Sequence, residues 1–146
     1  MRVLVQRSLK SSVTVNNEVV GSIDNGLVLF VGFTEGDDSS KIDYLVNKVL
    51  NLRIFDDENG IMNKSILDAQ GSILSISQFT LYADTKKGNR PSYINALGGD
   101  KATLLYDEFN KKLKEHIHVE TGIFGADMKV NITNDGPITI LLESRE

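Results

Sequence analysis

The chain has 146 residues, 40% of them hydrophobic and 25% charged, which predicts a single globular domain over residues 1–146 and argues against disorder or low-complexity sequence. It contains no cysteine, which excludes disulfides, a thiol nucleophile and cysteine-ligated metal centres, and no apolar run approaches about 20 residues, so we expect a cytoplasmic protein without a membrane span. The net charge of −4 argues against a surface coated in positive charge for general nucleic-acid binding, although it allows a small local basic contact.

The first third of the chain is predicted to consist mainly of strands. An apolar run opens it at 3–5, and the valines between positions 13 and 20 flank the pair Asn16-Asn17, which suits a tight hairpin turn. Residues 27–31 form a continuous apolar run, which is typical of a strand that is buried on both faces.

Two helices are predicted. The first covers about 40–51, where a Ser-x-x-Asp capping pattern from Ser40 to Asp43 precedes apolar residues at helical spacing. The second begins with Asp100 as its N-cap, and lysines in its last turns suit the negative end of the helix dipole. Its apolar face consists of Ala102, Leu105, Phe109 and Leu113.

Further strand-like stretches lie between and after the helices, at 53–55, 72–82, 116–120, 128–133 and 138–143. With the first third of the chain they give roughly eight strands and two helices. We therefore predict an α+β fold, in which a mostly antiparallel or mixed sheet curls into a β-barrel-like core with two helices packed outside.

Two neighbouring segments carry polar groups that invite a functional interpretation. Ser77–Asp84 places serine, glutamine and threonine in an otherwise apolar stretch, which indicates either a satisfied structural network or a site, and the residues alone slightly favour the network. The loop that follows carries Lys86, Lys87 and Arg90 against one acid. It is either an ordinary solvated loop or a small patch that contacts phosphate.

The stretch Asn134-Asp135-Gly136-Pro137 is a turn signal by composition. A plain turn between the last two strands accounts for it as well as a functional turn does. Glycine leaves the neighbouring carbonyl oxygens uncovered, and a cis bond before Pro137 would be a deliberate feature.

The two histidines, His116 and His118, would share one strand face with Glu120, and these three residues suit half of a metal site. A solvated strand face is the commoner meaning of such a pattern. A serine–histidine–aspartate triad would need one of the two histidines, and nothing in the sequence supports it. Neither a Gly-x-Ser-x-Gly elbow nor a phosphate-binding Gly-rich loop is present.

Four motifs occur in order along the chain: Ser77 to Leu81 (SQFTL), Lys87 to Ser92 (KGNRPS), Thr121 to Met128 (TGIFGADM) and Asn134 to Thr139 (NDGPIT). Together with Val5-Gln6-Arg7 near the start, they resemble the D-aminoacyl-tRNA deacylases. Each motif alone is weak, but four in the right order make the resemblance specific. It departs from the family at Ile138, where valine is usual, and at Tyr93, where phenylalanine is frequent, and neither change alters polarity on the catalytic side.

The resemblance implies a cytoplasmic homodimer with a β-barrel-like fold and no metal or organic cofactor. Its substrate would be D-aminoacyl-tRNA, or glycine on a mismatched tRNA as in glycyl-tRNA(Ala), and the reaction would hydrolyse the ester to the 3′-terminal ribose. The active sites would lie at the dimer interface, where the cis Gly-Pro pair of one subunit enters the pocket of the other.

By the same resemblance, the main chain at Phe79 and Thr80 would form an oxyanion hole, while Ser77 and Gln78 would fix that segment and the terminal adenosine. The Thr80 hydroxyl would orient the water or the ester. We do not assign it as the nucleophile, because no base accompanies it in the sequence. A ribose hydroxyl beside the ester would supply the missing base.

The resemblance also implies how chirality is read. The carbonyls of Gly136 and Pro137 would exclude an L side chain and capture the α-amino group, so that L-aminoacyl-tRNA is rejected and glycine passes. Arg7 would brace the Gly-Pro turn across the interface.

The remaining assignments concern the tRNA itself. Phe124 and Met128 would line an adenosine pocket, although ordinary core packing explains them equally well. Lys86, Lys87 and Arg90 would contact phosphates. Two other classes of protein stay open at this point: a metal-dependent hydrolase and a non-catalytic RNA-binding module.

Overall fold

The structure, a computed structural model, describes residues 1–144. Its elements in chain order are β1 (Arg2–Val15), β2 (Glu18–Ile23), β3 (Gly26–Gly32), α1 (Ser39–Asn51), β4 (Phe55–Asp56), β5 (Met62–Lys64), α2 (Ile66–Ala69), β6 (Ser72–Ser77), the 3-10 helix η1 (Phe79–Tyr82), α3 (Gly99–Lys114), β7 (Val119–Thr121) and β8 (Lys129–Glu143). Among these residues no helix is long and apolar enough to cross a membrane.

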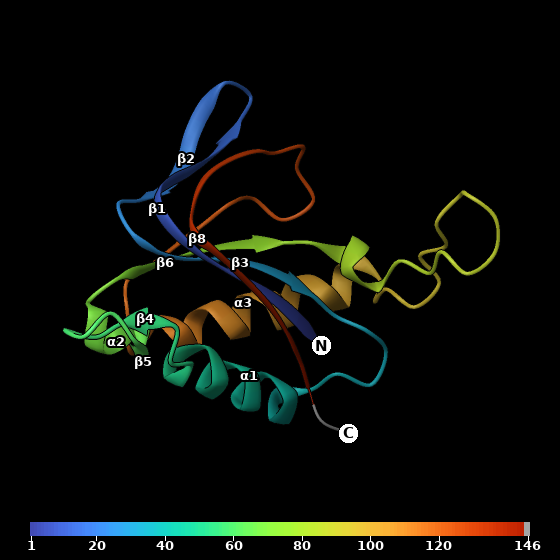
Figure 1. The fold of residues 1–146 in the computed structure, drawn as a ribbon. Helices are drawn as coiled ribbons and strands as arrows, with labels where there is room; N and C mark the ends of the chain where they lie inside the picture. The colour runs from blue at the N-terminus through green and yellow to red at the C-terminus, as the bar shows by residue number, and fades with distance from the viewer. Residues whose placement is uncertain (145–146) are drawn as a thin grey trace.

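A six-stranded mixed sheet forms the body of the molecule (Figure 1). Its strands follow the order β2-β1-β3-β6-β7, and β8 pairs with the other edge of β1. The pairs that β1 makes are antiparallel, whereas β3 with β6 and β6 with β7 are parallel. Residues 2–8 of β1 pair with β3, and residues 11–15 of the same strand pair with β2. The long strand β1 therefore joins two parts of the sheet, and the sheet curls toward a barrel. The predicted α+β fold with a mixed, barrel-like sheet and two main helices outside is confirmed.

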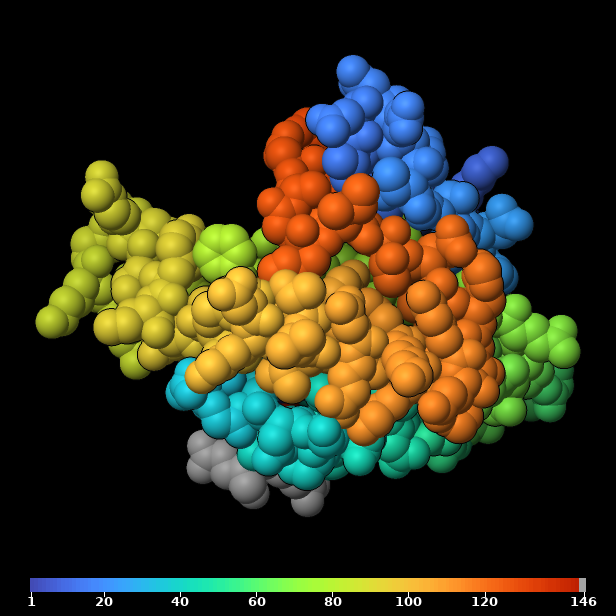
Figure 2. Space-filling model, turned by 180° about the vertical axis from the view of Figure 1, so that it is seen from behind, coloured from blue at the N-terminus to red at the C-terminus, as the bar shows by residue number. Residues whose placement is uncertain are grey.

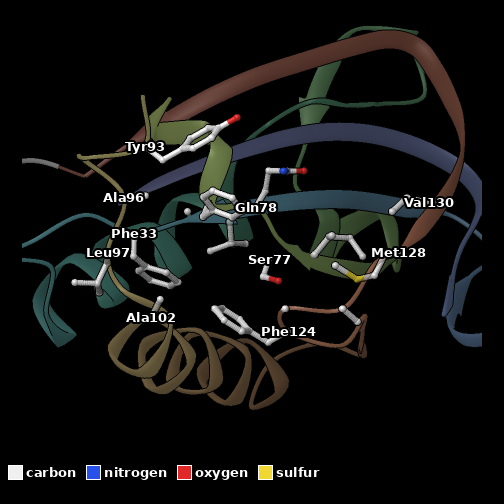
Figure 3. Close-up of a pocket in the computed structure, with 17 residues that line it drawn as sticks. Phe33, Ser77, Gln78, Tyr93, Ala96, Leu97, Ala102, Phe124, Met128 and Val130 are labelled. Atoms are coloured by element: carbon white, nitrogen blue, oxygen red, sulfur yellow. The ribbon is translucent and has the colours of Figure 1, made fainter. Parts of the chain in front are cut away.

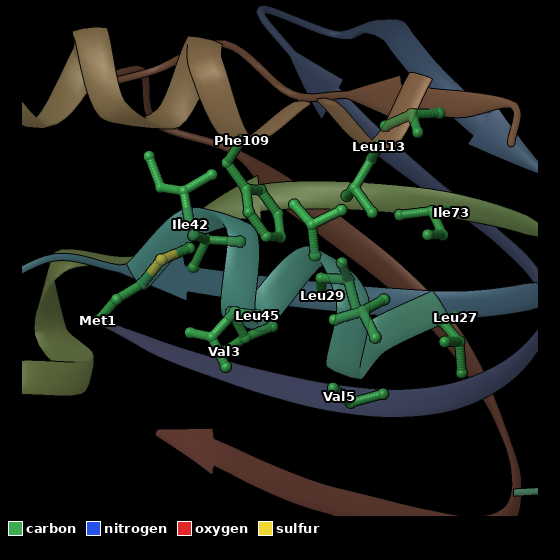
Figure 4. Packing of buried hydrophobic residues seen from close by; sticks show 14 of the residues in the cluster. Met1, Val3, Val5, Leu27, Leu29, Ile42, Leu45, Ile73, Phe109 and Leu113 are labelled. Atoms are coloured by element: carbon green, nitrogen blue, oxygen red, sulfur yellow. The ribbon is translucent and has the colours of Figure 1, made fainter. Parts of the chain in front are cut away.

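The main core lies between the sheet and the helices α1 and α3, which pack side by side on one face (Figures 1 and 4). Alternate residues of β1 and β3 point into it and meet one apolar stripe from each helix. Its fully buried side chains include Val3, Val5, Leu27, Leu29, Ile42, Leu45, Phe109 and Leu113. A smaller cluster contains Val28, Leu74 and Ile76. Strand β3 is therefore buried on both faces, as its sequence predicted.

Both predicted helices exist, but the N-caps predicted for them are wrong. Helix α1 begins at Ser39, and its N-cap is Asp38, whose Oδ1 accepts hydrogen bonds from the backbone N–H of Ser40 (3.0 Å) and Lys41 (3.3 Å). The Ser-x-x-Asp pattern thus begins inside the helix, where Ser40 has no capping role. Helix α3 has Gly98 as its N-cap, and Asp100 lies in the first turn, where a carboxylate suits the helix dipole.

Several predicted strand boundaries also change. The extended stretch predicted over 72–82 ends at Ser77, and the chain then turns into η1. The stretch predicted over 116–120 pairs only from Val119, because the end of α3 continues through a backbone hydrogen bond from the Ile117 N–H to Leu113. The strand predicted over 53–55 starts at Phe55 and forms a small hairpin with β5.

The two strands predicted over 128–133 and 138–143 are one strand, β8, with a bulge inside it. Its pairing with β1 passes from Gln6↔Thr139 to Ser8↔Asn134, so the residues between 134 and 139 bulge outward opposite Arg7. The turn predicted there is therefore a bulge in a long edge strand, and it holds the Gly-Pro pair.

Candidate active site

A cavity of about 520 Å³ lies at the carboxyl ends of β3 and β6, above helix α3 (Figure 3). The two strands are parallel and in register, with Val31 opposite Ser77, so the segments that follow them leave the sheet at the same edge. Its walls are mainly apolar, and five of the predicted site residues line it: Ser77, Gln78, Phe79, Phe124 and Met128.

The main-chain turn after β6 forms one wall of this cavity. The Gln78 N–H donates to the carbonyl of Val31 (2.7 Å), which ends the parallel pairing, and the Leu81 N–H donates back to the carbonyl of Gln78 (3.3 Å). The N–H groups of Phe79 and Thr80 precede this first hydrogen bond of the 3-10 turn. Within residues 1–144 neither N–H has an acceptor. Two adjacent main-chain donors are therefore free at the edge of the cavity.

A side-chain hydrogen bond orients the hydroxyl of Thr80. The Gln78 side-chain amide donates to the Thr80 Oγ1 over 2.6 Å. Because the oxygen accepts this hydrogen bond, the hydroxyl proton is directed elsewhere and can be donated to a ligand. No histidine or carboxylate among residues 1–144 hydrogen-bonds to Thr80, so nothing in this part of the chain activates it as a nucleophile.

Aromatic side chains line the cavity, among them Tyr93 and Phe124 (Figure 3). Phe79 also lines it, is 54% exposed and meets Tyr93 edge-on, with ring centroids 5.1 Å apart. Phe124 packs on the Tyr106 ring, and the Tyr106 hydroxyl donates to the carbonyl of Ser75 in β6. Burial raises the pKa of the Tyr106 phenol, so the group stays a neutral donor.

The Gly-Pro pair lies in the bulge of β8, and its peptide bond is cis. Arg7 holds the bulge: its Nε donates to the carbonyl of Asp135 (3.2 Å) and lies 3.3 Å from the Asp135 carboxylate. The Nη1 of the same guanidinium donates to the carbonyl of Ile54 (2.9 Å) and lies 3.6 Å from Asp56. Arg7 is only 8% exposed, and these contacts hold the bulge of its own chain, whereas the predicted brace across an interface stays a prediction.

In one chain the structure does not bring the two predicted halves of the site together. Neither Arg7 nor the pair Gly136-Pro137 lines the cavity that contains Ser77 to Phe79. Thr80 follows the lining residues directly and is held against them by Gln78.

The basic residues of the predicted phosphate patch lie on a long loop that projects from the body of the molecule (Figures 1 and 2). The loop is closed at its base by a pair of backbone hydrogen bonds, each 2.8 Å long, between Asp84 and Ser92. Lys86, Lys87 and Arg90 make no ion pair within residues 1–144. Their charges are therefore available to an anionic partner.

The predicted grouping of histidines on a strand face is wrong. His116 lies in the turn that ends α3, whereas His118 precedes β7 and places its Nε2 3.0 Å from the carboxylate of Glu120. In the part of the chain that the structure describes, no three His, Asp or Glu side chains gather as a metal site would require.

One contact of the turn was not anticipated from the sequence. The Nη1 of Arg2 donates to the carbonyl of Leu81 (2.8 Å), and its guanidinium lies over the Tyr82 ring, 4.5 Å from the centroid. Burial raises the pKa of the Tyr82 phenol to about 12. An arginine at the start of a strand carries no local signal for such a contact, because its partner is 79 positions away.

Comparisons with known proteins agree with this geometry. The family model described as D-Tyr-tRNA(Tyr) deacylase matches residues 4–143. A D-aminoacyl-tRNA deacylase from Clostridium tetani is 54% identical and the match covers 100% of this chain and 99% of that protein, and one from Bacillus cytotoxicus is 55% identical, with 99% and 100% covered.

Solved structures show the same fold. The one described as c-Myc DNA Unwinding Element Binding Protein superposes with a TM-score of 0.95 at 39% identity, and the match covers 100% of both chains. A probable eukaryotic D-amino acid tRNA deacylase superposes with a TM-score of 0.83 at 18% identity over 97% of each chain, which is a likeness of fold.

Proposed function

We propose which part of the site performs each step of the reaction, given that the chain belongs to the D-Tyr-tRNA(Tyr) deacylase family and is a D-aminoacyl-tRNA deacylase, a hydrolase that binds tRNA. The cavity beside η1 holds the 3′-terminal aminoacyl-adenosine and hydrolyses its ester. The bulge that contains Gly136 and Pro137 rejects the L form. The observation that carries the assignment is the pair of free N–H groups at Phe79 and Thr80, which face no acceptor within residues 1–144.

Ester hydrolysis passes through a tetrahedral intermediate whose oxygen carries negative charge. Donors that are fixed before the reaction stabilise that oxygen without reorganisation, and removal of one oxyanion-hole donor, a side-chain amide, costs about 3–4 kcal/mol in a well-studied hydrolase. The N–H groups of Phe79 and Thr80 are suited to this task, because the hydrogen bonds of Gln78 on one side and Leu81 on the other fix the turn. The oxyanion hole is thus made of main chain.

Water is the nucleophile, and Thr80 orients it or the ester. Gln78 occupies the Thr80 oxygen as an acceptor, which directs the hydroxyl proton toward the substrate. The ribose hydroxyl beside the ester takes the role of the base, since Tyr93 is the only titratable side chain among residues 1–144 that lines the cavity. This substrate-assisted route needs no protein nucleophile.

The apolar walls of the cavity suit a nucleoside. Phe124 and Met128 line it together with Phe33 and Leu97, and ligand pockets that are apolar with a few fixed polar groups are typical of small organic ligands. The terminal adenosine of tRNA is such a ligand, because its base stacks on aromatic surfaces. Ser77 and Gln78 supply the polar contacts at the same wall.

Rejection of L-aminoacyl-tRNA requires a second copy of the chain. The Gly136-Pro137 bulge does not line the cavity of its own chain, and β8, which carries it, pairs only with β1 among the described strands. In a homodimer the bulge of one subunit enters the cavity of the other, where its carbonyls receive the α-amino group and leave no room for an L side chain. Glycine has no side chain to exclude, so glycyl-tRNA is also hydrolysed.

Two variants of this chain test whether the halves of the site come from different subunits. Thr80→Ala damages the cavity and Gly136→Ala damages the bulge, so each homodimer has two defective sites. When both chains are co-expressed, random pairing gives one intact site in each mixed dimer, which adds about a quarter of the wild-type activity to the residual activity of the defective sites. No recovery in dimers that are shown to be mixed would mean that each site is built from one chain.

The direct test of the activity uses matched D-aminoacyl-, L-aminoacyl- and glycyl-tRNA with the pure protein, and follows the loss of the amino acid. We expect rapid loss from the D and glycyl forms and persistence of the L form. Loss of the L form at the same rate would overturn the proposed role of Gly136 and Pro137. Activity that disappears with a chelator and returns with a metal ion would favour a metal-dependent hydrolase, and tRNA binding without any turnover would favour a non-catalytic RNA-binding module.

A further inference from the structure

We propose that Arg2 and Gly32 hold the turn Phe79–Tyr82 in place against the sheet. Arg2 is then a positioning residue for deacylation, although it does not line the cavity. The two residues are direct cross-strand partners, Arg2 at the start of β1 and Gly32 at the end of β3, next to the point where β6 ends and the turn begins. The inference rests on the proposed function, because it concerns the main-chain donors of Phe79 and Thr80.

Arg2 holds the far end of the turn through two different contacts. Its Nη1 donates to the carbonyl of Leu81 over 2.8 Å, and its guanidinium carbon lies 4.5 Å from the centroid of the Tyr82 ring. A planar guanidinium makes a directed hydrogen bond and a ring contact at the same time, which an ammonium group does less well. Two consecutive residues of the turn are therefore tied to one side chain of β1.

Gly32 has no side chain, and this allows the start of the turn, at Gln78, to lie close to the sheet. A Cβ at this position would lie 2.8 Å from the carbonyl oxygen of Gln78 and 3.2 Å from the Cβ of Leu81. The first distance is shorter than real Cβ contacts, and the atom it meets is main chain, so any side chain here pushes the turn away from the sheet. The backbone of Gly32 has no left-handed φ, so the requirement for glycine is one of space alone.

The two contacts enclose the reactive part of the turn. At the start of the turn, the Gln78 N–H donates to the carbonyl of Val31, and the Gln78 carbonyl lies close to the sheet because Gly32 has no side chain. At the end of the turn, Arg2 donates to the carbonyl of Leu81. Phe79 and Thr80 lie between these fixed points. The direction of their free N–H groups is thus set by residues of β1 and β3 that lie far from them in the sequence.

The experiment compares Arg2→Gln, Arg2→Lys and Gly32→Ala with the control Arg53→Gln. Arg53 also donates from its guanidinium to a backbone carbonyl, that of Asn63 (3.1 Å), but it lies just before β4 and its acceptor lies in β5. Each protein is measured in two ways: kcat and KM for D-aminoacyl-tRNA, and hydrogen exchange of the Leu81 and Ala83 N–H groups, whose hydrogen bonds define the turn. The thermal midpoint of each variant identifies any general loss of folding.

For Arg2→Gln we expect a fall in kcat of about tenfold, KM within about threefold of the wild type, and exchange at Leu81 and Ala83 that is about tenfold faster. Arg2→Lys recovers part of kcat, because an ammonium can still reach a carbonyl. Gly32→Ala gives the same changes in kcat, KM and hydrogen exchange if it folds. If it does not fold, Arg2→Gln alone tests the proposal. The control Arg53→Gln changes neither measurement.

Two results would overturn the proposal, and they can be told apart. Unchanged exchange at Leu81 and Ala83 in Arg2→Gln would mean that Arg2 does not hold the turn. Faster exchange with an unchanged kcat would mean that the order of the turn is irrelevant to the chemistry, and the proposed oxyanion role of Phe79 and Thr80 would fall with it.

Discussion

The side-chain amide of Gln78 donates a hydrogen bond of 2.6 Å to the hydroxyl oxygen of Thr80, two residues further along the chain. The contact lies at the wall of the cavity, where the N–H of Thr80 is also free. One residue therefore offers a ligand two donors, one from the main chain and one from the side chain. Only the second can be removed by substitution without disturbing the backbone.

Thr80→Ala removes that hydroxyl donor and leaves the main-chain donors in place. A hydrogen bond of this kind contributes about 1 kcal/mol, so we expect kcat for D-aminoacyl-tRNA to fall by about tenfold or less rather than to vanish. Thr80→Ser keeps the hydroxyl and serves as the control, with activity close to the wild type. Single-turnover measurements separate this step from product release, and full activity of Thr80→Ala would remove the hydroxyl from the mechanism.

Gly136→Ala tests the bulge of β8. Gly136 has a φ of +120°, and a Cβ there would lie 3.0 Å from Cγ1 of Ile138 and 3.4 Å from the guanidinium of Arg7. We expect the variant to bind and hydrolyse D-aminoacyl-tRNA at least about tenfold less well, since the added methyl group and the shifted bulge obstruct the substrate.

The control for this substitution is Gly60→Ala. Gly60 also has a positive φ, of +75°, but a Cβ there would meet nothing within 4 Å. It reproduces the backbone strain without the obstruction, and we expect a lower thermal midpoint with normal turnover. Normal turnover by Gly136→Ala as well would place the Gly-Pro bulge outside the site.

Neutralising the basic loop tests its contact with tRNA. In the triple variant Lys86→Gln, Lys87→Gln and Arg90→Gln we expect weaker binding and a slope of log affinity against log salt that is smaller by about two. The effect on kcat is small, because the loop lies away from the reacting ester. Affinity measured across a range of salt concentrations provides the slope.

The matched control removes the same charge elsewhere, through Lys10→Gln, Lys48→Gln and Arg53→Gln. These three residues are exposed and belong to neither the cavity nor the loop. An equal loss of slope in both triple variants would show that only the net charge matters, and that the loop makes no specific phosphate contact.

The N-cap of α1 gives a prediction about stability and pH. The Ser40 hydroxyl first, and then the Lys41 N–H, donate to the Asp38 carboxylate and lower its pKa below the ordinary value of 3.8. A group whose pKa is lower in the folded state stabilises that state fully above the unfolded value and loses the contribution as the pH falls through the folded value. The thermal midpoint of Asp38→Ala should therefore lie below that of the wild type at pH 7, and the difference should shrink below pH 3.8.

Asp38→Asn separates charge from capping, because asparagine caps a helix but does not titrate in this range. Its thermal midpoint should stay above that of Asp38→Ala at every pH. If the difference in thermal midpoint between the wild type and Asp38→Ala stayed constant to well below pH 3.8, the charge of the carboxylate would contribute nothing beyond its hydrogen bonds.

The sequence predicts local structure well wherever the deciding contacts are local. The pair Asn16-Asn17 forms the expected hairpin turn, with φ values of 50° and 66° that asparagine tolerates. The apolar run of β3 forms a strand that is buried on both faces. The sequence predicts such a strand because it requires only apolar neighbours, whichever part of the chain supplies them. Both features follow from patterns within a few residues.

The parts of the site that the sequence does not predict depend on distant partners. Residues 72–82 read as one strand in the sequence, yet the parallel pairing ends with the hydrogen bond from the Gln78 N–H to the Val31 carbonyl. The chain then forms the turn Phe79–Tyr82, whose Leu81 carbonyl is held by Arg2. Likewise, Asn134 to Pro137 has the composition of a plain turn but lies in a bulge of one long strand. Arg7 of β1 holds this bulge through the Asp135 carbonyl, and no short window of sequence contains both residues.

The pairing of β1 with β8 also has a consequence for synthesis on the ribosome. Gln6 and Thr139 are 133 positions apart, so at about 10 residues per second β1 waits for roughly ten seconds or more before its partner has been made. During that time one edge of β1 is open and able to recruit another nascent chain. Polar side chains at Arg2, Gln6 and Lys10 interrupt the apolar residues of β1, and residues of this kind disfavour pairing of an open strand edge with another chain.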